Sequence, residues 1–185
     1  MNIGFVSTRL AGVDGVSLEI AKLVTILREL GHASFYCAGE LDPVTPPARL
    51  VPEMHFTHPT AKRLHDEAFS TAHPPARLFR DIYASADYLR GELKAFVEQY
   101  GIDVIISQNA NAIPMNLALG VAIADLARRN RIKVLCHSHD YYFERTRFIN
   151  NGIQSLLDEA FPPKLETVRH MSISTVMQQR LYAWR

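Results

Sequence analysis

Short runs of β-forming residues alternate along this chain with longer segments of helical periodicity, and this alternation limits the fold more than any other feature of the sequence. The β-like runs are residues 3–7, 33–38, 102–107, 132–136 and 168–173. Between them, apolar residues recur at helical spacing over 16–30, 76–100 and 114–130. The run 102–107 lacks the alternation of apolar and polar residues, which is typical of a strand buried on both faces. The pattern predicts an α/β fold, a Rossmann-like open parallel β-sheet with helices on both faces.

The remaining segments are less regular. Loops are expected over 42–52 and 138–149, a short third strand over 54–57, and further helices over 153–161 and after a capping Ser174. Residues 59–73 fit either a loop or a helix. Because the chain has neither an internal repeat nor a long linker, we expect residues 1–185 to form one domain.

Composition excludes several classes of function. The net charge is +1, with 20 Lys and Arg against 19 Asp and Glu, so the clustered basic excess of a nucleic-acid-binding protein is missing. Cys37 and Cys136 have no metal-binding spacing, and both lie in strand-like stretches, which predicts two buried thiols in a reducing compartment. The sequence has neither a secretory signal nor a run of 18 apolar residues. We therefore expect a cytoplasmic protein and leave a role at a membrane surface open.

Ligands of open parallel sheets bind outside the carboxyl ends of the strands. The loop after the first strand contains Gly12, Asp14 and Gly15 just before a helix, where glycines allow close approach of a ligand and the helix N-terminus favours an anion. The spacing matches neither the dinucleotide fingerprint nor a P-loop. A tight turn with Asp14 capping the helix explains the same residues.

The segment after residues 132–136 reads His137-Ser138-His139-Asp140. If the strand continues, His137 and His139 point the same way and could share a site, where a histidine beside a carboxylate can bind a hydroxyl or exchange a proton. A loop of satisfied polar groups is the alternative. A zinc site is a third interpretation, but the sequence supplies no further ligand set, and we expect no metal.

Two more groups of polar residues follow strand ends. Asn109, with Ser107 and Gln108 before it, offers amide donors and acceptors for hydroxyl groups, although a turn would explain it equally well. Arg145 and Arg147 lie among aromatic residues after the histidine segment. Arginine binds phosphate or carboxylate in a bidentate manner, and aromatic rings pack against sugars. A loop held by its aromatic residues, with solvated charges, is the alternative.

Three sequence segments together resemble a known family. The first is Gly12-Val13-Asp14-Gly15-Val16-Ser17, followed by a helix and Leu30-Gly31-His32. The second is His139-Asp140 with Phe143-Glu144-Arg145-x-Arg147-Phe148, and the third is Phe161-Pro162-Pro163 with Arg169-His170-x-x-Ile173-Ser174. In order and spacing they resemble the N-terminal domain of family 4 retaining glycosyltransferases, which have the GT-B fold of two Rossmann-like domains. The resemblance runs from residue 1 to 185, with residues 40–100 matching only in outline.

The resemblance implies roles for these residues. His139, with Asp140, would lie beside the transferred sugar as the catalytic pair, and the loop of Gly12, Asp14 and Gly15 would approach the donor diphosphate and the acceptor. Acceptor-binding residues would be Asn109, His137, Arg145, Arg147 and Ser174. The substrates would be a nucleotide-sugar and an acceptor, without a metal ion, because basic residues of the second domain would stabilise the leaving diphosphate.

The sequence also departs from the family. The family's C-terminal, donor-binding domain carries a Glu-x7-Glu motif, which has no counterpart here, so we expect an acceptor-side domain that is inactive alone and whose partner is the missing domain. The donor and acceptor cannot be read from the sequence, although Arg9, Arg145 and Arg147 hint at an anionic acceptor. Two alternatives remain open. One is a non-catalytic module that binds a sugar, a nucleotide or a partner chain, and the other is a domain related to sugar-nucleotide epimerases.

Overall fold

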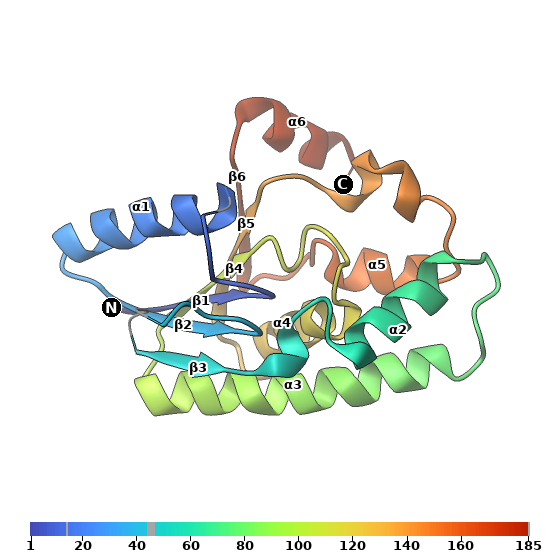
Figure 1. Cartoon of the computed structure of the whole chain (residues 1–185). Coiled ribbons are helices and arrows are strands. Elements are labelled where there is room, and N and C mark those ends of the chain that lie inside the picture. The colour runs from blue at the N-terminus through green and yellow to red at the C-terminus, as the bar shows by residue number, and fades with distance from the viewer. Residues whose placement is uncertain (14, 44–46, 185) are drawn as a thin grey trace.

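The computed structural model describes residues 1–13, 15–43 and 47–184, and its centre is a parallel sheet of six strands (Figure 1). The strands are β1 (Asn2–Ser7), β2 (Ala33–Ala38), β3 (Ala48–Leu50), β4 (Val104–Gln108), β5 (Lys133–Ser138) and β6 (Val168–Ser172). Their order across the sheet is β3-β2-β1-β4-β5-β6, which is the order of the doubly wound Rossmann fold. The expected α/β class and the open parallel sheet are confirmed.

Helices cover both faces of this sheet (Figure 1). They are α1 (Gly15–Glu29), α2 (Pro59–Phe69), α3 (Leu78–Tyr100), α4 (Leu117–Arg129), α5 (Gln154–Ala160) and α6 (Thr175–Trp184). Three short 3-10 turns lie in the connections, η1 (Pro52–Met54), η2 (Tyr142–Glu144) and η3 (Thr146–Phe148). The larger apolar core lies between the sheet and α3 and α4, and a smaller core, which includes Phe5, Ile20 and Ile106, lies beneath α1.

Helix α4 is buried along almost its whole length. Its small residues allow close packing, and at Gly120 a Cβ atom would come within 2.1 Å of the Phe161 ring. The expected start at Pro114 is wrong, since the side chain of Asn116 accepts a hydrogen bond from the backbone N–H of Leu119 at 3.1 Å and caps the helix there. The same side chain donates to the carbonyl of Met54 at 3.0 Å, which ties the cap to η1.

The irregular segment after β2 differs most from expectation. The third strand is Ala48–Leu50, paired with Tyr36 to Ala38 of β2, and the expected strand over 54–57 is wrong. Pro47 and Pro52 flank this short strand, which is tolerated because the strand lies at an edge of the sheet. Residues 59–69, left open between loop and helix, form α2.

The strand order creates one reversal of direction. From β1 the chain moves outward to β2 and β3, and α3 then returns it to β4 on the other side of β1. The loops after β1 and β4 therefore lead away from each other, and a crevice forms between them at the carboxyl end of the sheet.

Candidate functional site

A cavity of about 310 Å³ lies at this crevice between the ends of β1 and β4. Its lining consists of Ser7, Thr8, Arg9, Gly15, Val16, Phe56, Gln108, Asn109, Ala110, Ile113, Met115 and His139. Three of the predicted site residues, Gly15, Asn109 and His139, thus come together although they follow three different segments of the chain. Parallel strands bring their carboxyl ends to one edge, which explains the convergence.

Asn109 fixes the loop that follows β5. Its backbone has a φ of 57°, a left-handed conformation that asparagine tolerates better than most residues. Its Oδ1 accepts from the backbone N–H of His139 at 3.1 Å, and its Nδ2 donates to Oδ1 of Asp140 at 3.3 Å. The Asn109 side chain therefore holds His139 and Asp140 at the cavity, in addition to lining it.

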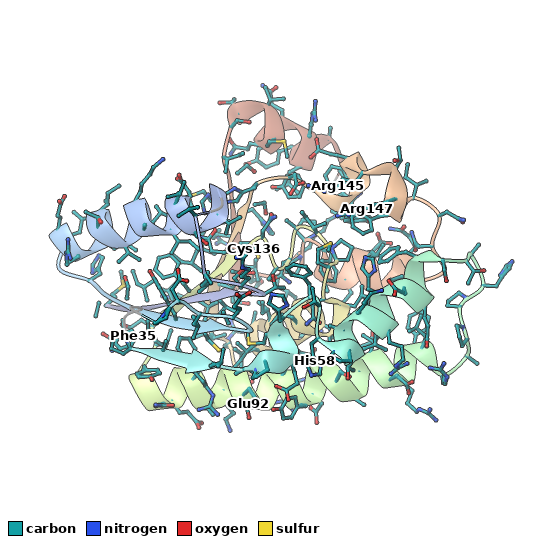
Figure 2. All side chains as sticks on the ribbon, viewed as in Figure 1. Phe35, His58, Glu92, Cys136, Arg145 and Arg147 are labelled. Atoms are coloured by element: carbon teal, nitrogen blue, oxygen red, sulfur yellow. The ribbon has the colours of Figure 1, made fainter. Side chains whose placement is uncertain are left out.

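Asp140 is ion-paired with Arg145, whose Nε donates to Oδ2 of Asp140 at 2.6 Å. Arg147 points elsewhere. Its guanidinium carbon lies 4.6 Å from the centre of the Phe148 ring, and its Nη2 lies 3.3 Å from the sulfur of Met115, a residue that lines the cavity. Figure 2 shows both arginines on the segment after β5. Arg145 thus braces the loop, while Arg147 reaches the rim of the cavity.

The rings of His137 and His139 lie side by side, with their centres 5.1 Å apart. His137 is almost completely buried at the end of β5, and His139 lines the cavity. Burial lowers the pKa of His137 from its usual value, the neighbouring His139 lowers it further, and the carboxylate of Glu19 on α1 opposes the change. His137 is therefore a neutral donor and acceptor near neutral pH.

The glycine-containing loop after β1 is held by a hydrogen bond to a residue that follows β2. Gly12 has a φ of 79°, and its N–H donates to Oδ2 of Asp42 at 2.9 Å. Gly15 begins α1 and lines the cavity, and a Cβ atom there would meet nothing within 4 Å among the described residues. Asp14, the third residue expected in this loop, lies outside the described residues.

Ser174 follows β6, two strands away from the crevice. Its Oγ accepts from the backbone N–H of Met177 at 3.3 Å, so it caps α6 as the sequence predicts. It lies outside the described lining of the cavity. A cap explains this residue without a ligand.

Sequence reasoning missed several residues of the cavity. Phe56, Ile113 and Met115 give it an apolar side, and Phe56 comes from the segment in which the sequence suggested a strand. No local pattern marks such residues, because only the packing of α2 and α4 brings their loops to the strand ends. The sequence marks Gln108 only as one amide in a polar stretch, yet this residue lines the cavity.

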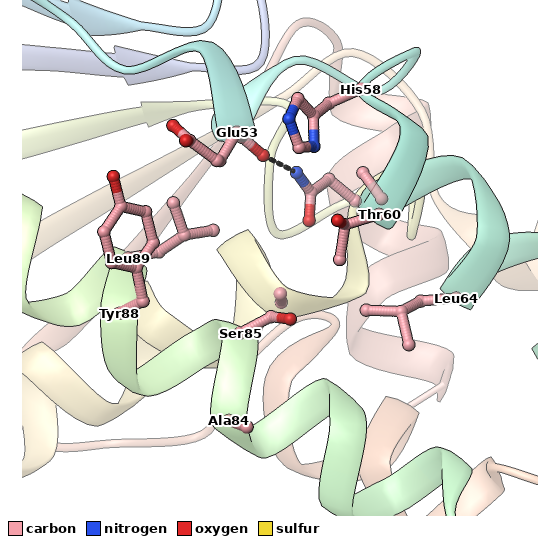
Figure 3. A pocket seen from close by; sticks show the side chains of 11 residues that line it. Glu53, His58, Thr60, Leu64, Ala84, Ser85, Tyr88 and Leu89 are labelled. Carbon is pink, nitrogen blue, oxygen red and sulfur yellow. Dashed lines mark hydrogen bonds between the residues drawn. The ribbon is translucent and has the colours of Figure 1, made fainter.

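A second cavity, of about 480 Å³, lies among η1, α2, α3 and the start of α4 (Figure 3). Its wall includes Glu53, His58, Ser85 and Tyr88. At one side of the cavity, the side chain of Asn116 donates a hydrogen bond to the backbone carbonyl of Glu53. None of the predicted site residues lines it within the described part of the chain. The cavity at the crevice is therefore the candidate site.

Over residues 1–13, 15–43 and 47–184, no three His, Cys, Asp or Glu side chains cluster closely enough to bind a metal ion. Within the same ranges, no helix is long and apolar enough to cross a membrane.

Comparison with known proteins gives no matching family model. The chain is 29% identical over 192 aligned residues to a mannosylglucosylglycerate synthase of Petrotoga mobilis, and 26% identical over 191 to one of Thermotoga maritima. Both relatives are glycosyltransferases. Each alignment covers 98% of this chain but 42% of the relative, so the chain spans less than half the length of the curated relatives it matches. A crystal structure of the glycosyltransferase VinC in complex with DTDP aligns with a TM-score of 0.42 and 11% identity, over 93% of this chain and 49% of that one.

Proposed function

We propose that this chain is the acceptor-side, Rossmann-like domain of a nucleotide-sugar-dependent glycosyltransferase with the GT-B fold, resembling family 4 and acting in carbohydrate biosynthesis. One observation carries the proposal. The cavity at the topological switch point lies in a chain that is similar over 98% of its length to enzymes named for making a glycosylated product. Because the relatives are more than twice as long, we assign donor binding to a second domain and expect little turnover from residues 1–185 alone.

The acceptor is proposed to carry a hexose and a negative charge. The relatives' name describes a product with mannosyl, glucosyl and glycerate parts, and glycerate contributes a carboxylate. Arg9 lines the cavity, where its Nε lies 3.1 Å from Oε2 of Glu40, and Arg147 lies at the rim. A guanidinium group binds a carboxylate through two parallel hydrogen bonds, so either arginine is a candidate partner for the acceptor's charge.

Roles at the reacting centre follow from position. His139 lines the cavity next to Asn109 and is proposed to bond a hydroxyl of the transferred sugar or stabilise charge that develops there. Asp140 would act through the loop, because its carboxylate is engaged by Arg145 and Asn109. The backbone from Gly12 to Gly15, at the start of α1, is proposed to approach the donor diphosphate. The second domain, rather than a metal ion, is proposed to stabilise the leaving group.

The proposed compartment is the cytoplasm. Cys37 is a buried free thiol, and Figure 2 shows that Cys136 also lies in the interior of the protein. Unpaired thiols are common in reducing compartments, which supports this placement.

The test joins this chain to the proposed donor-binding domain and supplies the protein with glucosylglycerate and with GDP-mannose, UDP-glucose or ADP-glucose. The reaction products are analysed by mass spectrometry. We expect a glycosylated product from one donor, and loss of at least about a hundredfold in kcat for His139→Ala. The matched control is His73→Ala, at an exposed histidine away from the cavity, which should behave as wild type.

Other results would favour the alternatives. Conversion of the nucleotide-sugar without an acceptor would indicate an epimerase, and binding without turnover would indicate a non-catalytic module. Arg147→Ala should raise the KM for a charged acceptor while leaving the KM for the nucleotide-sugar unchanged. Unchanged acceptor kinetics would remove Arg147 from the site.

A further inference from the structure

Three polar side chains form a row across neighbouring strands at the end of the sheet. Ser7, Gln108 and His137 are exposed by only 4%, 1% and 3%. Gln108 is paired in register with His137, and Ser7 follows Val6, which pairs with Ser107. The row is therefore a continuous strip across β1, β4 and β5.

The strip faces α1. Two residues earlier on β1 and β4, Phe5 and Ile106 belong to the core beneath α1, and side chains two residues apart on a strand point the same way. Gln108 therefore points to the side of the sheet where α1 begins, and it lines the cavity there together with Gly15 and His139.

The amide of Gln108 is the unusual group in this strip. Neither its Oε1 nor its Nε2 has a hydrogen-bond partner among the described residues, although both atoms are buried. The backbone carbonyl of Gln108, in contrast, accepts from the hydroxyl of Ser7 at 3.1 Å. Its neighbour Ser107 is equally buried, but the side chain of Ser107 has a hydrogen-bond partner, since its Oγ donates to Oδ1 of Asn111 at 2.7 Å. Burial of an unsatisfied amide destabilises a fold, and an apolar side chain of similar size would avoid this cost.

We propose that Gln108 is a specificity-determining residue that binds two neighbouring hydroxyl groups of a sugar in the cavity. The amide accepts from one hydroxyl through Oε1 and donates to the other through Nε2, so it complements a vicinal diol and requires no charge on the ligand. Thr8 and Asn109 line the same cavity and supply further polar contacts. This inference deepens the proposed function, because it names the sugar ring, rather than the acceptor's charge, as the part held at β4.

The substitution Gln108→Met separates a binding role from a structural one. Methionine keeps the length of the side chain and removes both polar atoms. We expect the 185-residue variant to melt at the same temperature as wild type or higher, because no hydrogen bond within the described protein is lost. We expect its dissociation constant for glucosylglycerate to rise at least about tenfold. The matched control is Ser107→Ala, which should lower the melting temperature and leave the dissociation constant unchanged.

The binding readout is nuclear magnetic resonance of the ¹⁵N-labelled chain titrated with glucosylglycerate and with glycerate alone. The side-chain amide signals of Gln108, identified by their absence in the variant, should shift with glucosylglycerate and stay in place with glycerate. Signals that do not move with the sugar, or a variant that melts lower and binds unchanged, would overturn the proposal. Failure of the proposed function is a separate result, since a protein without transferase activity can still shift these signals.

Discussion

Arg145 donates through Nε to the carboxylate of Asp140 at 2.6 Å and so joins the residue between η2 and η3 to the residue next to His139. The same carboxylate accepts from the side chain of Asn109 at the end of β4. Asp140 therefore connects two strand ends, and under the proposed function any effect of Asp140 on chemistry would run through the position of His139.

Asp140→Asn should loosen this connection while leaving the side chain's shape intact. It replaces a charge-assisted bond to Arg145 with a weaker neutral one, so we expect a loss of about 1 kcal/mol in the free energy of unfolding, measured by urea denaturation. Asp87→Asn is the matched control, because Asp87 is largely exposed and pairs with Arg90 along α3. Equal losses in the two variants would contradict the bracing role of Asp140.

Gly120 and Gly91 should respond to alanine in opposite directions. A Cβ atom at Gly120 would lie 2.1 Å from the Phe161 ring in the buried interior of α4, so Gly120→Ala should destabilise the protein by about 1–3 kcal/mol or more. Gly91 is exposed within α3, and a Cβ atom there meets nothing within 4 Å among the described residues. Gly91→Ala should therefore stabilise by about 0.5–1 kcal/mol. Thermal unfolding of both variants checks the pair, and adding Phe161→Leu should recover part of the Gly120 loss.

The sequence predicted the sheet and the place of the site for the same reason. Buried parallel strands lack apolar–polar alternation, and the polar residues that follow them, such as Asn109 and His139, must meet at one edge. The sequence did not predict β3, because an edge strand of three residues between Pro47 and Pro52 is too short to show a recognisable pattern of apolar residues. Nor could it show that Arg145 would be engaged by Asp140, or that the amide of Gln108 would be buried, since both depend on packing between distant segments.

His137 should make stability depend on pH. Burial lowers its pKa in the folded chain, so between that lowered value and the usual 6.5 the unfolded chain binds a proton that the folded chain does not. The free energy of unfolding therefore keeps the full contribution of the neutral His137 above pH 6.5. It loses this contribution as the pH falls below 6.5. His137→Gln should therefore flatten the decline in the free energy of unfolding between pH 7 and 5, measured by urea denaturation. The exposed His73→Gln should keep the wild-type slope, and an unchanged slope in His137→Gln would contradict the assignment.

Cys37 should be unreactive in the folded protein. Its thiol is fully buried, with Sγ 3.7 Å from the sulfur of Met54, and burial raises its pKa to about 12, so almost none of it is thiolate at pH 8. A disulfide reagent should label Cys37 only as fast as the chain unfolds. Met54→Ala would remove the packing beside the thiol, lowering the free energy of unfolding by about 2–5 kcal/mol and speeding the labelling. Cys136, also buried but on β5, is the internal control. In this variant, faster labelling of Cys37 than of Cys136 would indicate local opening around η1. Equal acceleration of both cysteines would indicate global unfolding. Labelling of Cys37 in the native wild-type protein would contradict its burial.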